Sequence, residues 1–270
     1  MIYIRQPYPN ELYHHGIKGQ KWGVRRYQNP DGSLTAAGKE RYRKFNIKDI
    51  EDTLHKVKIS DINKNLEERK AAIDSDTRFY KHITTTPDFK LGNSDRLFVF
   101  SEPDSPSYAG IMAARQRMRK RSVYEVALEL SKSPNVAGRE QQEKILHSVL
   151  KTLNESEKYD LDNKVKTFWD NFGNYEDTVS KLDNQAYFEA LPYIMDKNGN
   201  HHKVWNNFIK QAKKEGYDTL LDLNDEIGNP NTAVASIRPL ILLDPDSQIM
   251  NYSVKELSDT DIVQELRKML

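Results

Sequence analysis

The apolar positions along the chain change their spacing from one segment to the next. Aromatic, aliphatic and β-branched residues follow one another in residues 78–84 and 97–100, as is typical of strands. Larger apolar residues alternate with smaller or charged ones in residues 123–130, which indicates a third strand. Two more apolar runs, at residues 217–223 and 238–243, predict strands late in the chain.

Apolar residues three or four positions apart predict helices before, between and after these strands. The expected helices cover about residues 35–44, 47–73, 108–120, 139–157, 204–216 and 254–269, with a helical patch around residues 168–172 and a helical or loop segment at 178–195. The helices are grouped between strands rather than alternating with them one for one. This order predicts an α+β fold and not a doubly wound sheet.

Three regions differ in composition along the chain. Residues 1–45 are basic and rich in glycine and aromatic residues; we expect an extended segment, then a turn at residues 31–32 and a short helix capped by Thr35. Residues 46–74 are polar with helical spacing, so they predict a helical spacer. Residues 75–270 contain every expected strand, which predicts one mixed-sheet domain with helical insertions.

The overall composition excludes several classes of protein. The 270 residues are 37% hydrophobic and 30% charged, which describes a globular chain able to build a core. A formal net charge of +1 gives no global attraction to nucleic acid or anionic lipid. Cysteine is absent, which removes disulfides and thiolate sites. No apolar stretch is long enough to span a membrane and no secretory signal is evident, so we expect a cytoplasmic location or one in a particle assembled there.

The positive charge is concentrated near the N-terminus. A segment with several glycines and cations can neither form a long helix nor bury a core, so we interpret it as a recognition element. Its candidate docking residues are Lys18, Lys21, Trp22, Arg25 and Arg26. Cations interleaved with aromatic residues also fit nucleic-acid binding, which stays an alternative.

The common catalytic motifs are missing from the sequence. It has no dinucleotide-binding glycine fingerprint, phosphate-binding loop, His-Glu-x-x-His or Gly-x-Ser-x-Gly. The pairs His14–His15 and His201–His202 are adjacent, and neighbouring side chains diverge on a strand or helix, so we expect surface histidines and no metal site.

Acidic residues collect at and just beyond the strand expected at residues 217–223. Asp218 and Asp222 have the same parity on that strand, and Asp225 and Glu226 follow it. Sites are commonly built where a strand end opens into a loop. The alternative is a turn in which Asp and Asn side chains bond to the local backbone.

Three residues of the first expected strand could bind a phosphate or carboxylate. Because side chains alternate along a strand, Arg78 and His82 should lie on one face with Tyr80, and Lys81 on the other. Lys81 and His82 are therefore not expected to serve one pocket. Each of the three is also compatible with a solvated position on the strand.

Residues 13–42 carry the succession Tyr-His-x-Gly-x-Lys-Gly-x-Lys-Trp-Gly-Val-Arg-Arg-Tyr-Gln-Asn, followed by Asp-Gly-Ser-Leu-Thr and Gly-Lys-x-Arg-Tyr. This resembles a recurring motif of proteins of tailed phages and prophages of Gram-positive bacteria, associated with minor head proteins. The resemblance implies docking to phage head or portal components, and a place in the virion or the host bacterial cytoplasm. It does not specify an activity.

A second resemblance covers residue 77 to about residue 246. Arg-Phe-Tyr-Lys, Leu-Phe-Val-Phe-Ser, Val-Tyr-Glu-Val, Gly-Tyr-Asp-Thr-Leu-Leu-Asp and Pro-Leu-Ile-Leu-Leu-Asp succeed one another there. The order is similar to that of phage-borne domains with an ADP-ribosyltransferase-like fold. NAD is the substrate that this resemblance implies, with a host protein as acceptor.

The resemblance also implies a role for particular residues. It places NAD contacts at Lys81, Arg78, Tyr80 and Tyr108, a pocket residue at Ser101, and the late acid at Asp222 or Asp225. The sequence departs from the family pattern because Lys stands where related phage domains tend to have Arg, and no Glu-x-Glu or Gln-x-Glu occurs near the late acid. We therefore expect either a diverged transferase or a non-catalytic head-interaction protein with a transferase-like fold. A cleft between residues 78–84 and 217–222, with a cation and a carboxylate facing each other across it, would support the transferase, whereas strands far apart would exclude it.

Overall fold

The chain divides into two compact units, Met1–Lys44 and Phe45–Leu270, which are described separately. The computed structural model describes residues 27–29, 31–41, 43–57, 78–91, 96–101, 105–171, 184–196, 198–223 and 236–270.

The described part of the first unit is a tight turn followed by a short helix. Gly32 has a φ of 85°, and its N–H donates to the carbonyl of Asn29 at 2.9 Å. Helix α1 (Ala36–Arg41) begins after Thr35, whose hydroxyl accepts from the N–H of Gly38 at 3.0 Å. A Cβ at Gly38 would lie 2.0 Å from the carbonyl oxygen of Tyr27, so only glycine lets these backbones approach. The turn and the capped helix predicted from the sequence are confirmed.

The second unit contains a seven-stranded mixed sheet with helices, so the α+β prediction is confirmed. All neighbouring strands pair antiparallel except β4 and β5, which are parallel. The strands are β1 (Phe79–Thr84), β2 (Leu97–Ser101), β3 (Tyr124–Leu130), β4 (Val136–Ala137), β5 (Thr219–Leu221), β6 (Leu240–Leu242) and β7 (Ile249–Glu256), in the order β4-β5-β6-β2-β1-β3-β7.

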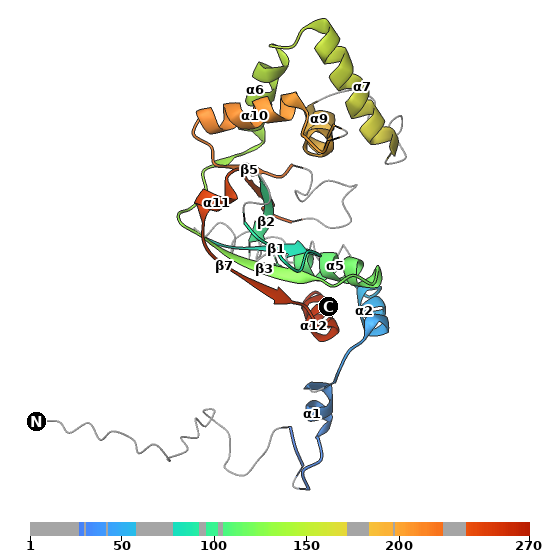
Figure 1. Cartoon of the computed structure of the whole chain (residues 1–270). Coiled ribbons are helices and arrows are strands. Elements are labelled where there is room, and N and C mark those ends of the chain that lie inside the picture. The colour runs from blue at the N-terminus through green and yellow to red at the C-terminus, as the bar shows by residue number, and fades with distance from the viewer. Residues whose placement is uncertain are drawn as a thin grey trace, which may run out of the picture. The chain divides into compact units, whose positions relative to one another are not determined.

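The sheet divides in the middle, between β1 and β2. These strands share only two register pairs, Tyr80 with Ser101 and Lys81 with Phe100, whereas β1 pairs with β3 over its whole length. In Figure 1, β2 and β5 run in a clearly different direction from β1, β3 and β7. The two halves of the sheet therefore separate beyond Lys81.

The helices form two groups, one for each half of the sheet. One group packs on the sheet through α5, which contacts β1 and the neighbouring β2, and the other lies beyond β4 and β5 (Figure 1). The first group consists of α2 (Ile47–Leu54), α5 (Ser105–Met118) and α12 (Asp259–Arg267). The second consists of α6 (Arg139–Leu150), α7 (Glu155–Asn171), α9 (Asn184–Ala190), η2 (Leu191–Tyr193) and α10 (Lys203–Lys214). The short helix α11 (Pro245–Gln248) precedes β7. Each group has its own buried cluster, with Ile50, Val123 and Ile262 in the first and Leu146, Phe208 and Leu220 in the second.

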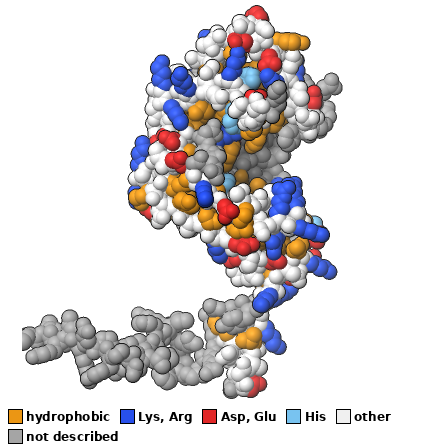
Figure 2. All heavy atoms as spheres, in the orientation of Figure 1, with side chains coloured by type: hydrophobic (Ala, Val, Ile, Leu, Met, Phe, Trp, Pro, Cys, Tyr) orange, Lys and Arg blue, Asp and Glu red, His pale blue; other side chains and the backbone are white. Residues whose placement is uncertain are grey.

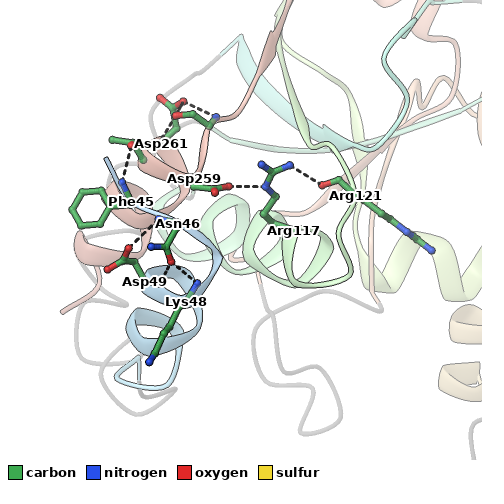
Figure 3. A network of polar contacts seen from close by, with 10 residues as sticks. Phe45, Asn46, Lys48, Asp49, Arg117, Arg121, Asp259 and Asp261 are labelled. Atoms are coloured by element: carbon green, nitrogen blue, oxygen red, sulfur yellow. Dashed lines mark hydrogen bonds and ion pairs between the residues drawn. The ribbon is translucent and has the colours of Figure 1, made fainter. Parts of the chain in front are cut away.

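Polar contacts join α12 to α5 and to the residue that begins this unit, and others cap α2 (Figure 3). Arg117 of α5 donates from Nε to Asp259 of α12 at 2.6 Å. Asn46 caps α2 by accepting from the N–H groups of Lys48 and Asp49. The N–H of Phe45 donates to the hydroxyl of Thr260, which connects the start of this unit to its last helix.

The prediction of one helix over residues 254–269 is wrong in its first part. Residues up to Glu256 belong to β7, and α12 begins only at Asp259. The register places Val254 opposite Val126 and Tyr252 opposite Leu128. Pairing with β3 therefore decides the conformation of this segment, and Ser258, which caps α12, marks the change.

Candidate functional site

A small cavity lies where β1 and β2 separate, between the two halves of the sheet. Its volume is about 60 Å³, enough for a few water-sized groups. Residues from both halves of the sheet and from α5 line it: His82, Ile83, Phe98, Val99, Phe100, Tyr108, Met112, Asp222, Pro239 and Leu240.

His82 is the imidazole of this cavity and forms a defined hydrogen bond. Its Nδ1 lies 2.8 Å from the carbonyl oxygen of Phe98. Because a carbonyl only accepts, Nδ1 carries the proton, and in the neutral ring Nε2 keeps its lone pair. Burial lowers the pKa of His82 below its ordinary value, so the ring is neutral at neutral pH. The cavity thus contains a hydrogen-bond acceptor and not a cation at this position.

Asp222 lines the same cavity from the other half of the sheet. It directly follows β5 and is 5% exposed. Its backbone N–H donates to the carbonyl of Pro239 at 2.8 Å, which fixes the residue beside β6. Asp222 and the first strand therefore line one cavity, but no Lys or Arg is among the described residues that line it, so the cation expected opposite this acid is not found there.

An aromatic wall from α5 and β2 completes the cavity. The rings of Tyr108 and Phe100 lie with their centroids 4.7 Å apart at an angle of 43°. The two tilted rings give this side of the cavity an apolar aromatic surface. The cavity therefore combines an imidazole, a carboxylate and an aromatic surface.

The other predicted residues of β1 lie outside the cavity. Lys81 pairs with Glu125 at 3.2 Å on the opposite face of the strand, and Arg78 pairs with Glu129 at 3.6 Å. Tyr80 is 2% exposed in the core. The predicted alternation of Lys81 and His82 is confirmed, and the residue of β1 whose ring faces the cavity is His82, which the resemblance had not selected.

Of the remaining predicted site residues, one is buried away from the cavity and the others lie outside the residues that the structure describes. Ser101 is fully buried at the end of β2, opposite Tyr80, and is not among the residues that line the cavity. Asp225 and the docking residues Lys18, Lys21, Trp22, Arg25 and Arg26 lie outside the described residues.

A larger groove of about 280 Å³ lies at the opposite end of β5. It contains Asp218, which accepts from the N–H of Asn135 at 2.8 Å and pairs with Lys132 at 3.0 Å. Asp218 and Asp222 therefore line different cavities, although their positions along the strand are separated by an even number of residues. The hydrogen bond from Asn135 to Asp218 connects the residues just before β5 to the loop before β4.

His202 has a structural role. Its Nδ1 accepts from the N–H of Val204 at the start of α10, and its Nε2 lies 3.5 Å from Asp160. Within the described ranges, no group of three or more histidine or acidic side chains could hold a metal ion.

Acidic and basic side chains are interspersed over the face of the second unit that Figure 2 presents. None of the helices in the described part of the chain is both long and apolar enough to cross a membrane.

Comparison with known proteins gives one match. A family of unknown function (DUF7211) matches residues 5–29, within the basic N-terminal segment. No curated protein and no solved structure matches the chain. The matched residues belong to the first unit, so the cavity of the second unit has to be interpreted from its own chemistry.

Falling pH should destabilise the fold through His82. In the unfolded chain the imidazole takes up a proton below pH about 6.5, whereas burial lowers its pKa in the folded chain. The unfolded state then binds more protons, so the free energy of unfolding falls as pH decreases from about 6.5 toward the folded pKa. Above that window this group contributes no pH dependence.

Urea unfolding at a series of pH values measures this slope, and His82→Gln should reduce it. The exposed His147 of α6 provides the control, since His147→Gln should keep the wild-type slope. Burial also lowers the pKa of His202, so part of the slope should survive in His82→Gln. Identical slopes in wild type and His82→Gln would contradict the prediction.

Proposed function

We propose that the second unit is an ADP-ribosyltransferase-like domain that binds NAD at the His82–Asp222 cavity, and that the protein is a virion-associated protein of a phage or prophage. The observation that carries the proposal is the cavity itself. Residues of the first strand and the acid after β5 line it together, as the ordered strand motifs imply, with His82 in place of the Lys81 or Arg78 that the resemblance selected. The expected transfer is of ADP-ribose to a host protein.

The chemistry of the cavity fits a sugar next to a planar ring. A neutral imidazole with a lone pair at Nε2 accepts from a sugar hydroxyl, whereas it offers no charge to a phosphate. The carboxylate of Asp222 would stabilise the positive charge that develops on the sugar as nicotinamide leaves. The Tyr108 and Phe100 rings provide a surface for an aromatic base.

A second candidate is a head-interaction protein with a transferase-like fold and no catalysis. The volume of about 60 Å³ favours it, because sites for whole small molecules usually measure about 300–1,000 Å³. The placement of Lys81 and Ser101 outside the cavity also favours it. The basic N-terminal segment would place either protein in the particle, since it resembles a motif associated with phage head proteins.

Calorimetry of the full chain with NAD tests the proposal first. We expect binding that His82→Gln weakens about tenfold, which corresponds to the loss of one hydrogen bond. His147→Gln, an exposed change on α6, should bind as wild type.

Labelled NAD with host lysate then separates the two candidates. Transfer of label or cleavage of NAD supports the transferase, and binding without either supports a non-catalytic NAD-binding domain. A chain that does not bind NAD but is found in purified particles would refute the NAD site and favour the head-interaction protein.

A further inference from the structure

Strand β7 forms one edge of the seven-stranded sheet. It pairs with β3 on its inner side from Ile249 to Glu256, and no strand in the described part of the chain pairs with its outer side. After a register irregularity near Leu130, the segment from Asn251 to Glu256 pairs with β3 without interruption. An edge of this kind presents unpaired backbone N–H and C=O groups to another strand.

The devices that usually protect a sheet edge are few along this segment. It contains no proline, and its lysine, Lys255, pairs with Asp261 of α12 at 2.7 Å. Its larger apolar side chains are partly open to solvent, with Tyr252 38% and Val254 37% exposed. The bulge lies at the beginning of β7 and leaves the following residues regular.

The sequence of this segment is complementary to itself in the antiparallel direction. With a twofold axis through Ser253, Tyr252 lies opposite Val254 of the other copy, and Asn251 lies opposite Lys255. Apolar residues then meet on one face and uncharged polar residues meet a lysine on the other, so no like charges are opposed. A twofold axis through Tyr252 would instead place Met250 opposite Val254, and Met250 lies at the register irregularity between β3 and β7.

We propose that two copies of this chain pair through their β7 edges, antiparallel and centred on Ser253, to form a continuous sheet. The pairing is independent of the NAD-binding proposal. A strand pair of this length buries a small area, so the dimer dissociates at micromolar concentration.

The absence of cysteine makes a direct test possible. Ser253→Cys changes one atom at the axis, where the Cα atoms of two opposed residues are about 4.5–5.5 Å apart, within the range of a disulfide. Under mild oxidation the full-length variant should form a covalent dimer. Ser247→Cys, an exposed serine on α11, is the matched control and should remain monomeric.

Light scattering of the wild type from low to high micromolar concentration should show a monomer–dimer equilibrium. Asn251→Lys places a lysine opposite Lys255 of the other copy and should weaken association at least tenfold, whereas Asn251→Glu should preserve or strengthen it. A wild type that stays monomeric throughout overturns the proposal. So does a dimer that forms in Asn251→Lys as in wild type, or equal crosslinking of the two cysteine variants.

Discussion

Asp222→Asn should lower the rate of NAD cleavage by about 10²- to 10³-fold and leave the folded protein intact. Asp222 lines the proposed NAD-binding cavity and is 5% exposed, so a carboxylate charge there would act on a bound sugar with little screening by water. Asn keeps the size of the side chain and the backbone hydrogen bond to Pro239, but removes the negative charge. The loss should appear in kcat more than in KM, because the positive charge on the sugar develops only in the transition state.

Single-turnover measurements with labelled NAD check this expectation. Asp246→Asn, on the exposed side of α11, removes the same charge elsewhere and should cleave NAD at the wild-type rate. Circular dichroism and an unchanged unfolding midpoint confirm that Asp222→Asn is folded. A variant as active as wild type would remove Asp222 from the chemistry, and a wild type without NAD cleavage would support the non-catalytic candidate.

Several strands could be predicted from the sequence, because the residue types that favour them lie within the strand itself. The aromatic and β-branched run before Thr84 and the apolar run before Ser101 are strands β1 and β2 within a residue or two. The strand β7 was missed, because residues 249–256 mix apolar, polar and charged side chains and seven of the eight are exposed. Its conformation depends on the register with β3, a contact between distant segments that no local pattern contains.

Some features of the site could likewise be predicted from local sequence patterns, whereas others depend on contacts between distant segments. Strand parity predicted correctly that Lys81 and His82 diverge, and the acidic residues after β5 marked one wall of the cavity. Which of these two β1 residues lines the cavity together with Asp222 depends on where β1 and β2 stop pairing. The hydrogen bond from His82 to the Phe98 carbonyl exists only because the strands separate there. The sequence carries no signal for that separation.

The position of Phe98 depends in turn on a buried arginine that connects the two sides of the second unit. Arg96 precedes β2 and is 9% exposed. Its Nη2 donates to the carbonyl of Pro192 in η2 at 2.6 Å. Its guanidinium lies 5.6 Å from the centroid of the Phe98 ring and 5.2 Å from that of Trp205 in α10. Arg96 thus joins the helices beyond β5 to the strand whose carbonyl orients His82.

Arg96→Met should lower the free energy of unfolding by about 2–3 kcal/mol. The substitution removes a charged hydrogen bond and two cation–π contacts, and burial of the apolar methionine side chain recovers part of that loss. Urea unfolding measures this, and Arg119→Met, an exposed change just after α5, should alter stability by less than about 0.5 kcal/mol. If Arg96 positions Phe98, the ¹⁵N chemical shifts of the His82 imidazole should also change in Arg96→Met and not in Arg119→Met. A stability loss with unchanged His82 shifts would mean that Arg96 only supports packing, and an unchanged stability would contradict the burial of its charge.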